Sequence, residues 1–277
     1  MTLDDSYQTI PVNCGPPLPY WRETQRPFCN LIFLVPLLFV YELGVLLAAH
    51  SRGTSIRNGA DAWLRLWLNQ VGIEIVWMPP ALLLGALIAW HMVTRQPWKT
   101  TWETLGGMVA ESLLYAFLLI MIGQLVDLSF RQAGSPRLQM GEGLVSSGTL
   151  IRLVTFMGAG IYEEFLFRLC LLPISYLALR VLLVPKHWAI AVTVVGTSVV
   201  FSLAHYLGSD SGQNAISMLA DAFFRVQSSR DLWFSFVFRV LAGMFFAGLY
   251  FYRGFGITVG AHATYDVVVG VILIQEI

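Results

Sequence analysis

Long apolar runs alternate with short polar stretches along most of the chain. A helix needs about 20 mainly apolar residues to cross the hydrocarbon core of a bilayer. By this measure we expect eight spans, at residues 28–49, 72–92, 105–127, 149–167, 169–184, 188–207, 233–252 and 255–275. The pattern therefore predicts an all-α fold, a polytopic transmembrane bundle of about eight helices.

Two places in this pattern depart from a plain span. Residues 72–92 contain Pro79 and Pro80, which remove backbone donors and are expected to kink or interrupt the helix. The runs 149–167 and 169–184 meet at Arg168, and the second run is short and carries Arg180. We expect residues 169–184 to form a partial or tilted span.

The polar stretches predict the remaining organisation. Residues 51–70 combine three arginines with tryptophans and leucines, which favours a helix lying in the membrane interface. Residues 131–143 are expected to form a loop, and residues 208–231 to contain an amphipathic helix near 214–226. We interpret residues 1–26 as a polar, proline-containing tail, without the basic start of a cleavable signal peptide, and residues 27–277 as one multi-pass membrane domain.

The composition supports a membrane protein. Hydrophobic residues make up 56% of the chain and charged residues 12%, about half the share found in soluble domains, and the mean hydropathy is +0.66. Seventeen basic and seventeen acidic residues balance, which argues against nucleic-acid binding. The three cysteines lack paired spacing, so neither a disulfide framework nor a zinc cluster is expected. We expect an integral protein of the cell (inner) membrane.

Charged residues interrupt the apolar stretch "GIYEEFLFR" at residues 160–168. Ionisable groups at membrane depth are costly and are paired, hydrated or functional. Glu164 and Arg168 are four residues apart, so they share a helix face and can form an ion pair. Glu163 lies about 100° around the helix from Glu164 and is left free for chemistry. The alternative is a plain ion pair beside a glutamate that reaches the membrane surface.

Two later apolar stretches carry histidines. "FSLAHYLG" places His205 four residues after Phe201, and "GAHATYDVVVG" places Asp266 four residues after His262. A single intramembrane histidine is commonly a packed, hydrogen-bonded residue, and His262 with Asp266 is also compatible with a structural hydrogen bond. Buried polar groups nevertheless seek partners, so we expect these helices to bring their polar residues to one hydrated cavity.

A carboxylate beside neutral imidazoles can bind and deprotonate water, and imidazole N–H groups can stabilise an oxyanion. Cys170 and Ser202 are the nearest nucleophiles, but neither stands beside a base, so attack by water fits better than covalent catalysis. Zinc bound by His205, His262 and a glutamate is the alternative. The chain has no HExxH motif, and we expect no cofactor.

Three motifs together, "EEFLFR", "FSLAH" and "HATYD", resemble the EExxxR, FxxxH and HxxxN/D motifs of the CPBP family. This family, also called Abi, contains the CAAX proteases and bacteriocin-processing proteins, including the type II CAAX prenyl endopeptidase. The order of the motifs and their places in apolar helices agree over about residues 150–270. The first 145 residues contribute only hydrophobicity to the resemblance.

The resemblance implies an eight-helix intramembrane glutamic endopeptidase that acts on a membrane-associated peptide or protein. By analogy, Glu163 is the general base that activates water, His205 helps to hold it, and Glu164 is tied to Arg168. His262 and Asp266 would line the oxyanion side. Well-characterised members have Asn where this chain has Asp266, and an ionised Asp cannot donate a hydrogen bond. Asp266 would instead orient His262, or stay protonated if buried.

Two other functions are compatible with polar residues inside spans. One is a proton- or ion-coupled transporter, which inverted repeats would favour, but we find none. The other is a non-catalytic immunity or scaffold protein of the same fold. The sequence determines neither the substrate, including whether it is prenylated, nor the orientation in the membrane, because lysines and arginines divide evenly between the two sides.

Overall fold

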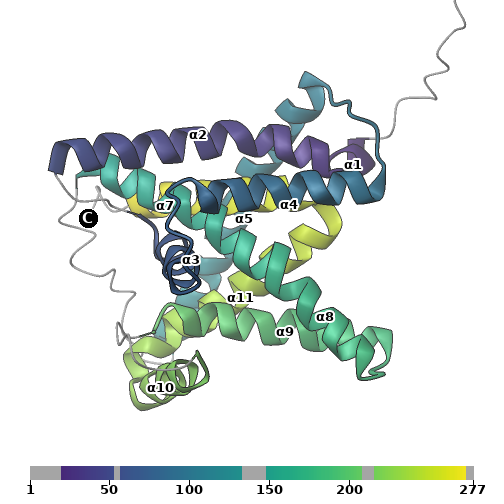
Figure 1. The fold of residues 1–277 in the computed structure, drawn as a ribbon. Helices are drawn as coiled ribbons and strands as arrows, with labels where there is room; N and C mark the ends of the chain where they lie inside the picture. The colour runs from purple at the N-terminus through teal and green to yellow at the C-terminus, as the bar shows by residue number, and fades with distance from the viewer. Residues whose placement is uncertain (1–19, 53–56, 133–147, 208–214, 273–277) are drawn as a thin grey trace, which may run out of the picture.

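A computed structural model describes residues 20–52, 57–132, 148–207 and 215–272 of the chain. These residues form helices and connections without a strand, which confirms the all-α fold (Figure 1). Within them, four helical segments are long and apolar enough to cross a membrane: Pro27–His50, Trp102–Phe130, Lys186–Ala204 and Arg230–Arg253. Two shorter apolar segments, Met78–Thr94 and Phe255–Val271, accompany them.

The last described helix, α12 (Phe255–Val267), forms the centre of the bundle. It packs against α5 (Trp102–Gln132), α7 (Thr149–Glu164), α11 (Arg230–Arg253) and α2 (Pro27–Arg52). Residues 255–263 are all buried, and the helix continues as the π-helical segment η2 (Val268–Ile272). The enclosure by four helices places the polar side chains of α12, His262 and Asp266, inside the bundle and away from lipid.

The region around Arg168 is one continuous helix. α7 ends at Glu164, the π-helical segment η1 (Phe165–Leu171) follows directly, and α8 (Leu172–Val181) completes the rod (Figure 1). The predicted division into two runs that meet at Arg168 is therefore wrong. A π-helical turn absorbs one extra residue without ending the helix, so Arg168 is a buried residue within the rod and not a break.

The paired prolines were also interpreted wrongly. α4 (Met78–Thr94) begins one residue before them, so Pro79 and Pro80 occupy its first turn. The first backbone N–H groups of a helix have no intrahelical acceptor, so prolines there cost no hydrogen bond and do not kink the helix. α4 packs beside α2.

Both predicted amphipathic segments are helices. α3 (Gly59–Gln70) lies within the interfacial segment, with Leu64 buried and Leu66 and Trp67 exposed. α10 (Ala215–Ser228) covers the segment expected near 214–226 and packs against α9 (Lys186–Ala204) and α11. The predicted loop at 131–143 lies largely outside the described residues, because α5 continues to Gln132 and the description resumes at residue 148.

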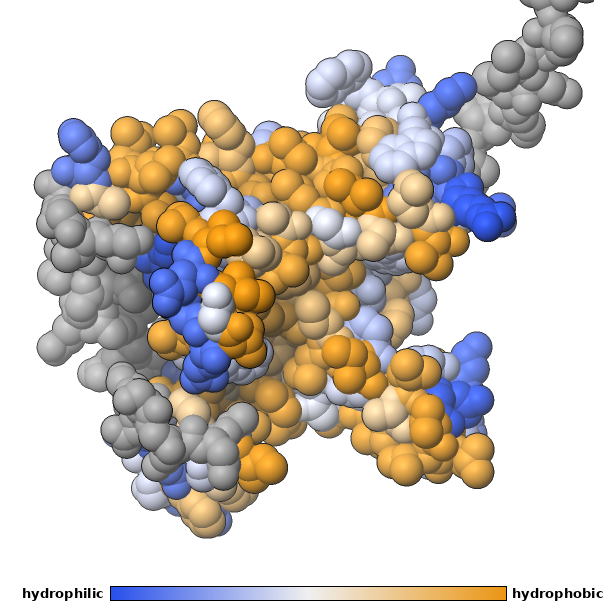
Figure 2. All heavy atoms as spheres, in the orientation of Figure 1, coloured by the Kyte–Doolittle hydropathy of each residue, from blue (hydrophilic) through white to orange (hydrophobic). Residues whose placement is uncertain are grey.

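The outer surface is broadly apolar. Figure 2 shows hydrophobic residues over most of the visible face, with hydrophilic residues gathered over α3 and at the ends of helices. Large exposed side chains include Phe39 on α2, Phe117 on α5 and Leu177 on α8. Exposed apolar area of this extent suits contact with lipid chains and not with water.

A short helix, α1 (Tyr20–Glu23), packs against the far end of α11. The Arg253 guanidinium lies 3.7 Å from the centre of the Trp21 ring and donates two hydrogen bonds to Glu111, at 2.7 and 2.5 Å. Residues 20–23, which the sequence placed in the polar tail, are thus in contact with the bundle. The domain boundary after residue 26 stays a prediction.

Candidate active site

Three parts of the bundle bring the six expected polar residues together. The α7–η1 rod carries Glu163, Glu164 and Arg168, and the remaining three, His205, His262 and Asp266, come from the end of α9 and from α12. Gly160 permits the approach of α7 to α12, because a Cβ there would lie 2.5 Å from the backbone nitrogen of Ala263. The expected convergence of the three helices is therefore present.

Glu164 is fully buried and bridges two cationic partners. Its Oε2 lies 3.1 Å from Arg168 Nε, and its Oε1 lies 2.7 Å from His262 Nδ1. Arg168 also donates from Nη2 to the Gly243 carbonyl of α11 at 3.1 Å. The predicted ion pair is present. The contact with His262 is an addition, because the sequence predicted only the pairing of Glu164 with Arg168.

Glu163 faces the two histidines from the other side. Its Oε2 lies 3.6 Å from His205 Nε2 and 4.0 Å from His262 Nε2. This oxygen is buried and has no hydrogen-bond partner among the described residues. Distances of 3.6 to 4.0 Å exceed a direct hydrogen bond and suit one water molecule shared by the groups.

The hydrogen bond between His205 and a backbone carbonyl determines which ring nitrogen carries the proton. The other ring nitrogen can then act as an acceptor on the side of Glu163. His205 Nδ1 lies 2.9 Å from the Phe201 carbonyl oxygen, which only accepts, so we assign the proton of a neutral ring to Nδ1. The lone pair of Nε2 then points toward the Glu163 carboxylate. Two acceptors at this distance need a donor between them, and a water molecule with two hydrogens supplies one to each.

His262 has polar partners at both nitrogens and an aromatic neighbour on one ring face. Besides the hydrogen bond to Glu164, its Nε2 lies 3.5 Å from Asp266 Oδ2. The Phe246 ring stacks on the imidazole with centroids 4.5 Å apart and planes 19° apart. The imidazole therefore has three carboxylates around it, those of Glu163, Glu164 and Asp266.

Aromatic rings enclose the Arg168 guanidinium. Its Cζ lies 4.5 Å from the centre of the Phe201 ring and 5.5 Å from that of Phe246. Phe201 was expected to position the histidine helix, and its carbonyl does bind His205. Phe246 could not be identified from the sequence, because it is one of 18 phenylalanines and lies outside the three motifs.

Other candidate groups are engaged elsewhere. Ser202 donates to the Phe236 carbonyl at 2.9 Å, and Cys170 packs at the edge of an apolar cluster around Tyr162. Arg239 was expected to pair with a carboxylate, but it donates to the hydroxyls of Tyr206 and Ser235. Within the described ranges, no group of three or more His, Cys, Asp and Glu side chains is arranged to bind a metal ion.

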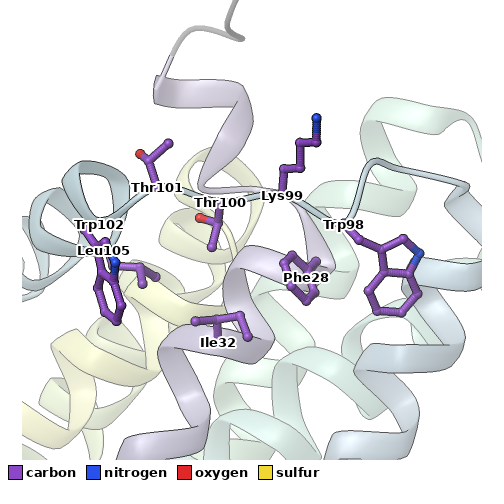
Figure 3. A pocket seen from close by; sticks show the side chains of 8 residues that line it. All are labelled: Phe28, Ile32, Trp98, Lys99, Thr100, Thr101, Trp102 and Leu105. Carbon is purple, nitrogen blue, oxygen red and sulfur yellow. The ribbon is translucent and has the colours of Figure 1, made fainter. Parts of the chain in front are cut away.

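One surface pocket lies away from these groups. It has a volume of about 490 Å³ and is formed by the first turns of α2, the connection before α5 and the start of α5 (Figure 3). Trp98, Thr100 and Leu105 are among its lining residues, and the lining contains no carboxylate or histidine. This pocket therefore lacks the combination of carboxylates and histidines found at the polar centre.

The fold and the polar centre together define a helical membrane protein with a carboxylate–histidine site inside its bundle. The family model for type II CAAX prenyl endopeptidase Rce1-like proteins matches residues 145–268, which include all six site residues. The resemblance to the CAAX proteases is thus confirmed over this part of the chain, and it indicates a protease of the membrane. No curated protein and no solved structure matches the chain.

Proposed function

We propose that the protein is an intramembrane endopeptidase in which Glu163 is the general base that activates water. The observation that carries this proposal is the position of Glu163 Oε2, 3.6 Å from His205 Nε2 and 4.0 Å from His262 Nε2. These three groups come from separate helices and share one point at which a water molecule can be bound. The family similarity supports peptide-bond hydrolysis as the reaction.

The hydrogen-bond pattern suggests how the water is oriented. One water hydrogen is donated to Glu163 and the other to the unprotonated Nε2 of His205. The oxygen lone pair then points away from both groups and toward the carbonyl carbon of a bound peptide. As the C–O bond forms, the water proton moves to the Glu163 carboxylate, and the carbonyl π electrons move to the oxygen.

His262 and the protonated Glu163 complete the reaction. An imidazolium at His262, with Nδ1–H bound to Glu164, presents its Nε2–H on the reacting side and stabilises the oxyanion. Collapse of the tetrahedral intermediate restores the carbonyl and breaks the C–N bond. The leaving amine takes the proton from Glu163, which regenerates the carboxylate. In this mechanism Asp266, whose Oδ2 lies 3.5 Å from His262 Nε2, supplies negative charge beside the imidazolium and does not donate to the oxyanion.

A direct test is the Glu163→Gln variant in proteoliposomes, assayed against a panel of membrane-anchored peptides. Each peptide is offered with and without a prenyl group, which separates a requirement for the lipid from one for the peptide. Gln has the shape of Glu but cannot take a proton, so we expect the turnover rate to fall by about 100-fold or more. His205→Ala is expected to impair turnover as well.

Glu103→Gln is the matched control, because Glu103 is exposed at the start of α5 and far in sequence from the site. This variant is expected to cleave at the wild-type rate. Unchanged cleavage by Glu163→Gln would exclude Glu163 as the base. Ion flux into the proteoliposomes without any cleavage would instead support a transporter.

Metal removal gives a second prediction. In the proposed mechanism the carboxylate and the imidazoles activate water without a Lewis acid, so prolonged treatment with a chelator is expected to leave the cleavage rate unchanged. The metal content of the purified protein, measured by mass spectrometry, is expected to be far below one zinc per chain. Loss of activity on chelation that returns with added zinc would contradict the proposed chemistry.

A further inference from the structure

The surface pocket at the start of α2 lies where three apolar helices end (Figure 3). α2 begins at Pro27 and α5 at Trp102, while α4 ends at Thr94. α2 and α5 are long and apolar enough to cross a membrane. Because the ends of spans lie at the level of the lipid headgroups, the pocket is placed at the boundary between headgroups and acyl chains.

The lining of this pocket changes from apolar to polar. Phe28 and Ile32 on the first turns of α2 line its apolar part, and Figure 3 shows the Lys99 side chain directed away from both. Trp98 and Trp102 lie on opposite sides of the pocket and are 52% and 86% exposed. Exposed tryptophans at the ends of spans are typical of the membrane interface. The order from hydrocarbon to ammonium group matches the order of groups in a phospholipid, from acyl chain to phosphate.

Positive charge is in excess around the pocket. Residues 20–28 and 91–105 contain most of its lining, and histidine apart they include four basic and two acidic residues. The basic residues are Arg22, Arg26, Arg95 and Lys99, and the acidic residues are Glu23 and Glu103. Basic groups beside a cleft between membrane helices complement the negative charge of an anionic headgroup.

A buried histidine beside the pocket has no hydrogen-bond partner. His91, near the end of α4, is 1% exposed, and neither of its ring nitrogens has a partner among the described residues. The centre of its ring lies 3.9 Å from that of Trp98 and 5.6 Å from that of Phe28. Both neighbours line the pocket. One aromatic ring therefore separates the imidazole from the pocket.

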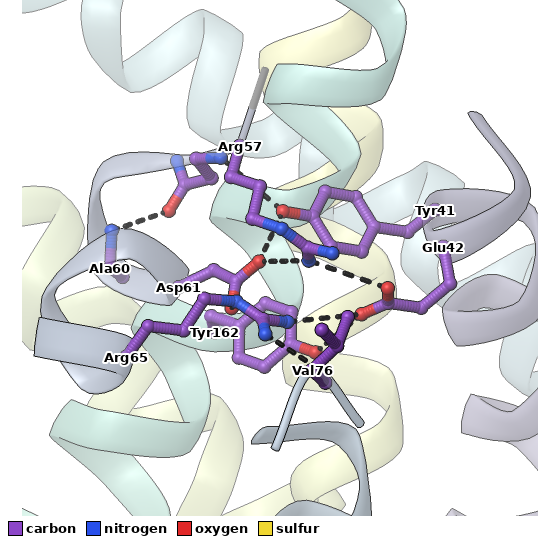
Figure 4. Close-up of polar contacts among 9 residues, drawn as sticks. Tyr41, Glu42, Arg57, Ala60, Asp61, Arg65, Val76 and Tyr162 are labelled. Carbon is purple, nitrogen blue, oxygen red and sulfur yellow. Dashed lines mark hydrogen bonds and ion pairs between the residues drawn. The ribbon is translucent and has the colours of Figure 1, made fainter. Parts of the chain in front are cut away.

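A buried polar cluster on α3 shows the contrast. Asp61 is fully buried and accepts from Tyr41, Arg57 and Arg65 at 2.7 to 2.8 Å (Figure 4). Glu42 on α2 accepts from Arg57 at 3.3 Å, so two arginines meet two carboxylates and the cluster needs no added charge. A buried imidazole without a partner costs stability, and water or a ligand is the usual explanation for such a group.

We propose that this pocket binds an anionic phospholipid. An acyl chain lies along Phe28 and Ile32, and the phosphate lies at Lys99. Rotation of the Trp98 ring brings the N–H of His91 to a phosphate oxygen. Trp98 belongs to the non-helical connection 95–101, so its ring can turn aside without disturbing a helix.

The apolar lining distinguishes a lipid from a free phosphate ion, which would gain nothing from Phe28 and Ile32. The pocket shares no lining residue with the polar centre around Glu163. The lipid site is therefore independent of the proposed peptidase activity.

Lipid binding by the full-length protein tests this proposal. The protein in mild detergent is titrated with phosphatidylglycerol or with phosphatidylcholine of the same acyl chains, and native mass spectrometry counts the lipids on each chain. We expect a single phosphatidylglycerol to bind about tenfold more tightly than phosphatidylcholine and to raise the thermal unfolding midpoint. Equal affinity for the two lipids would overturn the proposal. Inorganic phosphate that displaces phosphatidylglycerol would also overturn it, because the pocket would then bind a free anion.

Two variants locate the lipid. Lys99→Gln is expected to weaken phosphatidylglycerol binding about fivefold and to leave phosphatidylcholine binding unchanged. Its control is Lys186→Gln, which removes the same charge at an exposed position in α9. Leu105→Trp fills the pocket and is expected to weaken the binding of both lipids, whereas Leu114→Trp, at a 62% exposed position of α5, is not. Wild-type binding by Lys99→Gln and Leu105→Trp would place the lipid elsewhere and contradict the proposal.

His91→Phe separates lipid binding from packing. Phenylalanine keeps an aromatic ring beside Trp98 but has no nitrogen, so in lipid-free detergent the unfolding midpoint is expected to stay the same or rise. Phosphatidylglycerol affinity is expected to fall about tenfold, because the donor to the phosphate is lost. His187→Phe, at an exposed position beside Trp188, is the control and is expected to bind normally. Wild-type affinity in His91→Phe would overturn the role of His91 in the site.

Discussion

Arg168 illustrates how a charge is made tolerable in the middle of an apolar bundle. Its guanidinium lies against the rings of Phe201 and Phe246, binds Glu164 and donates to the Gly243 carbonyl. Arginine suits this place because a planar cation can stack on aromatic rings while its edge forms hydrogen bonds. A lysine would supply the charge from a single nitrogen, but not the planar group that stacks on the rings while separate nitrogens reach Glu164 and Gly243.

Removing this cation is expected to be costly for stability. Arg168→Met leaves the fully buried Glu164 with His262 as its remaining partner, and breaking a buried pair in this way costs about 3–5 kcal/mol. The free energy of unfolding, measured in detergent by a denaturant titration, is expected to fall by that amount. Arg180→Met is the control, because Arg180 is exposed near the end of α8.

The double variant Glu164→Gln with Arg168→Met tests the cause. It removes both charges of the pair, so it is expected to recover much of the lost stability without recovering turnover, since His262 loses the carboxylate at Nδ1. A double variant as unstable as Arg168→Met alone would show that packing around the guanidinium, and not the unpaired charge, is responsible.

At the level of single helices, the close contact of α7 with α12 sets the separation of Glu163 and His262. A Cβ at Gly160 would lie 2.5 to 2.6 Å from the backbone and side chain of Ala263. Backbone atoms cannot rotate away, so the two helices must separate or shift if this space is filled.

We therefore expect Gly160→Ala to destabilise the protein by about 1–3 kcal/mol and to lower turnover strongly, because overpacking moves α12 with its histidine. Gly196→Ala is the matched control, since no atom lies within 4 Å of a Cβ at that position in α9. There the substitution is expected to be neutral or to stabilise by up to about 1 kcal/mol. Equal behaviour of the two variants in unfolding and cleavage assays would contradict this account.

The helices show which structural facts a sequence pattern can predict. The apolar runs at 28–49, 105–127 and 188–207 correspond to α2, α5 and α9 because length and hydrophobicity alone determine such helices. The continuous rod through Arg168 was missed, since a π-helical turn leaves no mark in hydrophobic periodicity. The start of the helix was predicted at residue 72, whereas α4 begins at Met78. In the first turn, Pro79 and Pro80 are compatible with the helix, whereas in its interior they would kink it.

The site was predictable only where spacing along one helix decides the geometry. The Glu164–Arg168 pair follows from a separation of four residues and is present. The contact of Glu164 with His262 and the stacking of Phe246 on His262 connect residues on different helices, 98 and 16 positions apart. Such contacts depend on how helices pack, which no local pattern encodes.

At the scale of the whole molecule, the segment that matches the family does not enclose its own site. α12 carries His262 and is packed between α5 and α2, both of which precede residue 145, as well as α7 and α11. Buried contacts with α2 and α5, such as Asn30 Oδ1 accepting from the Gly256 N–H at 2.7 Å, reinforce this packing. The first 145 residues therefore contribute more than hydrophobicity.

This arrangement predicts that residues 145–277 expressed alone will not yield an active, folded protein. The apolar surfaces of this segment that pack against α2 and α5 would face lipid instead. Buried polar groups would also lose their hydrogen-bond acceptors. Coexpression with a second polypeptide of residues 1–144 is expected to restore a complex that copurifies and cleaves. Folding and cleavage by the segment 145–277 alone, judged by unfolding midpoint and rate, would disprove this dependence.

The unequal exposure of the site has a consequence for the route of the substrate. Side-chain exposure falls from 28% at His205 through 19% at Asp266 and 14% at Glu163 to 6% at His262, and Glu164 has none. The exposure of the site is thus greatest at His205 and absent at Glu164. Under the proposed function, a peptide is expected to approach from the side of His205, so an extended chain must bend locally or present a free end to bring its scissile bond to Glu163.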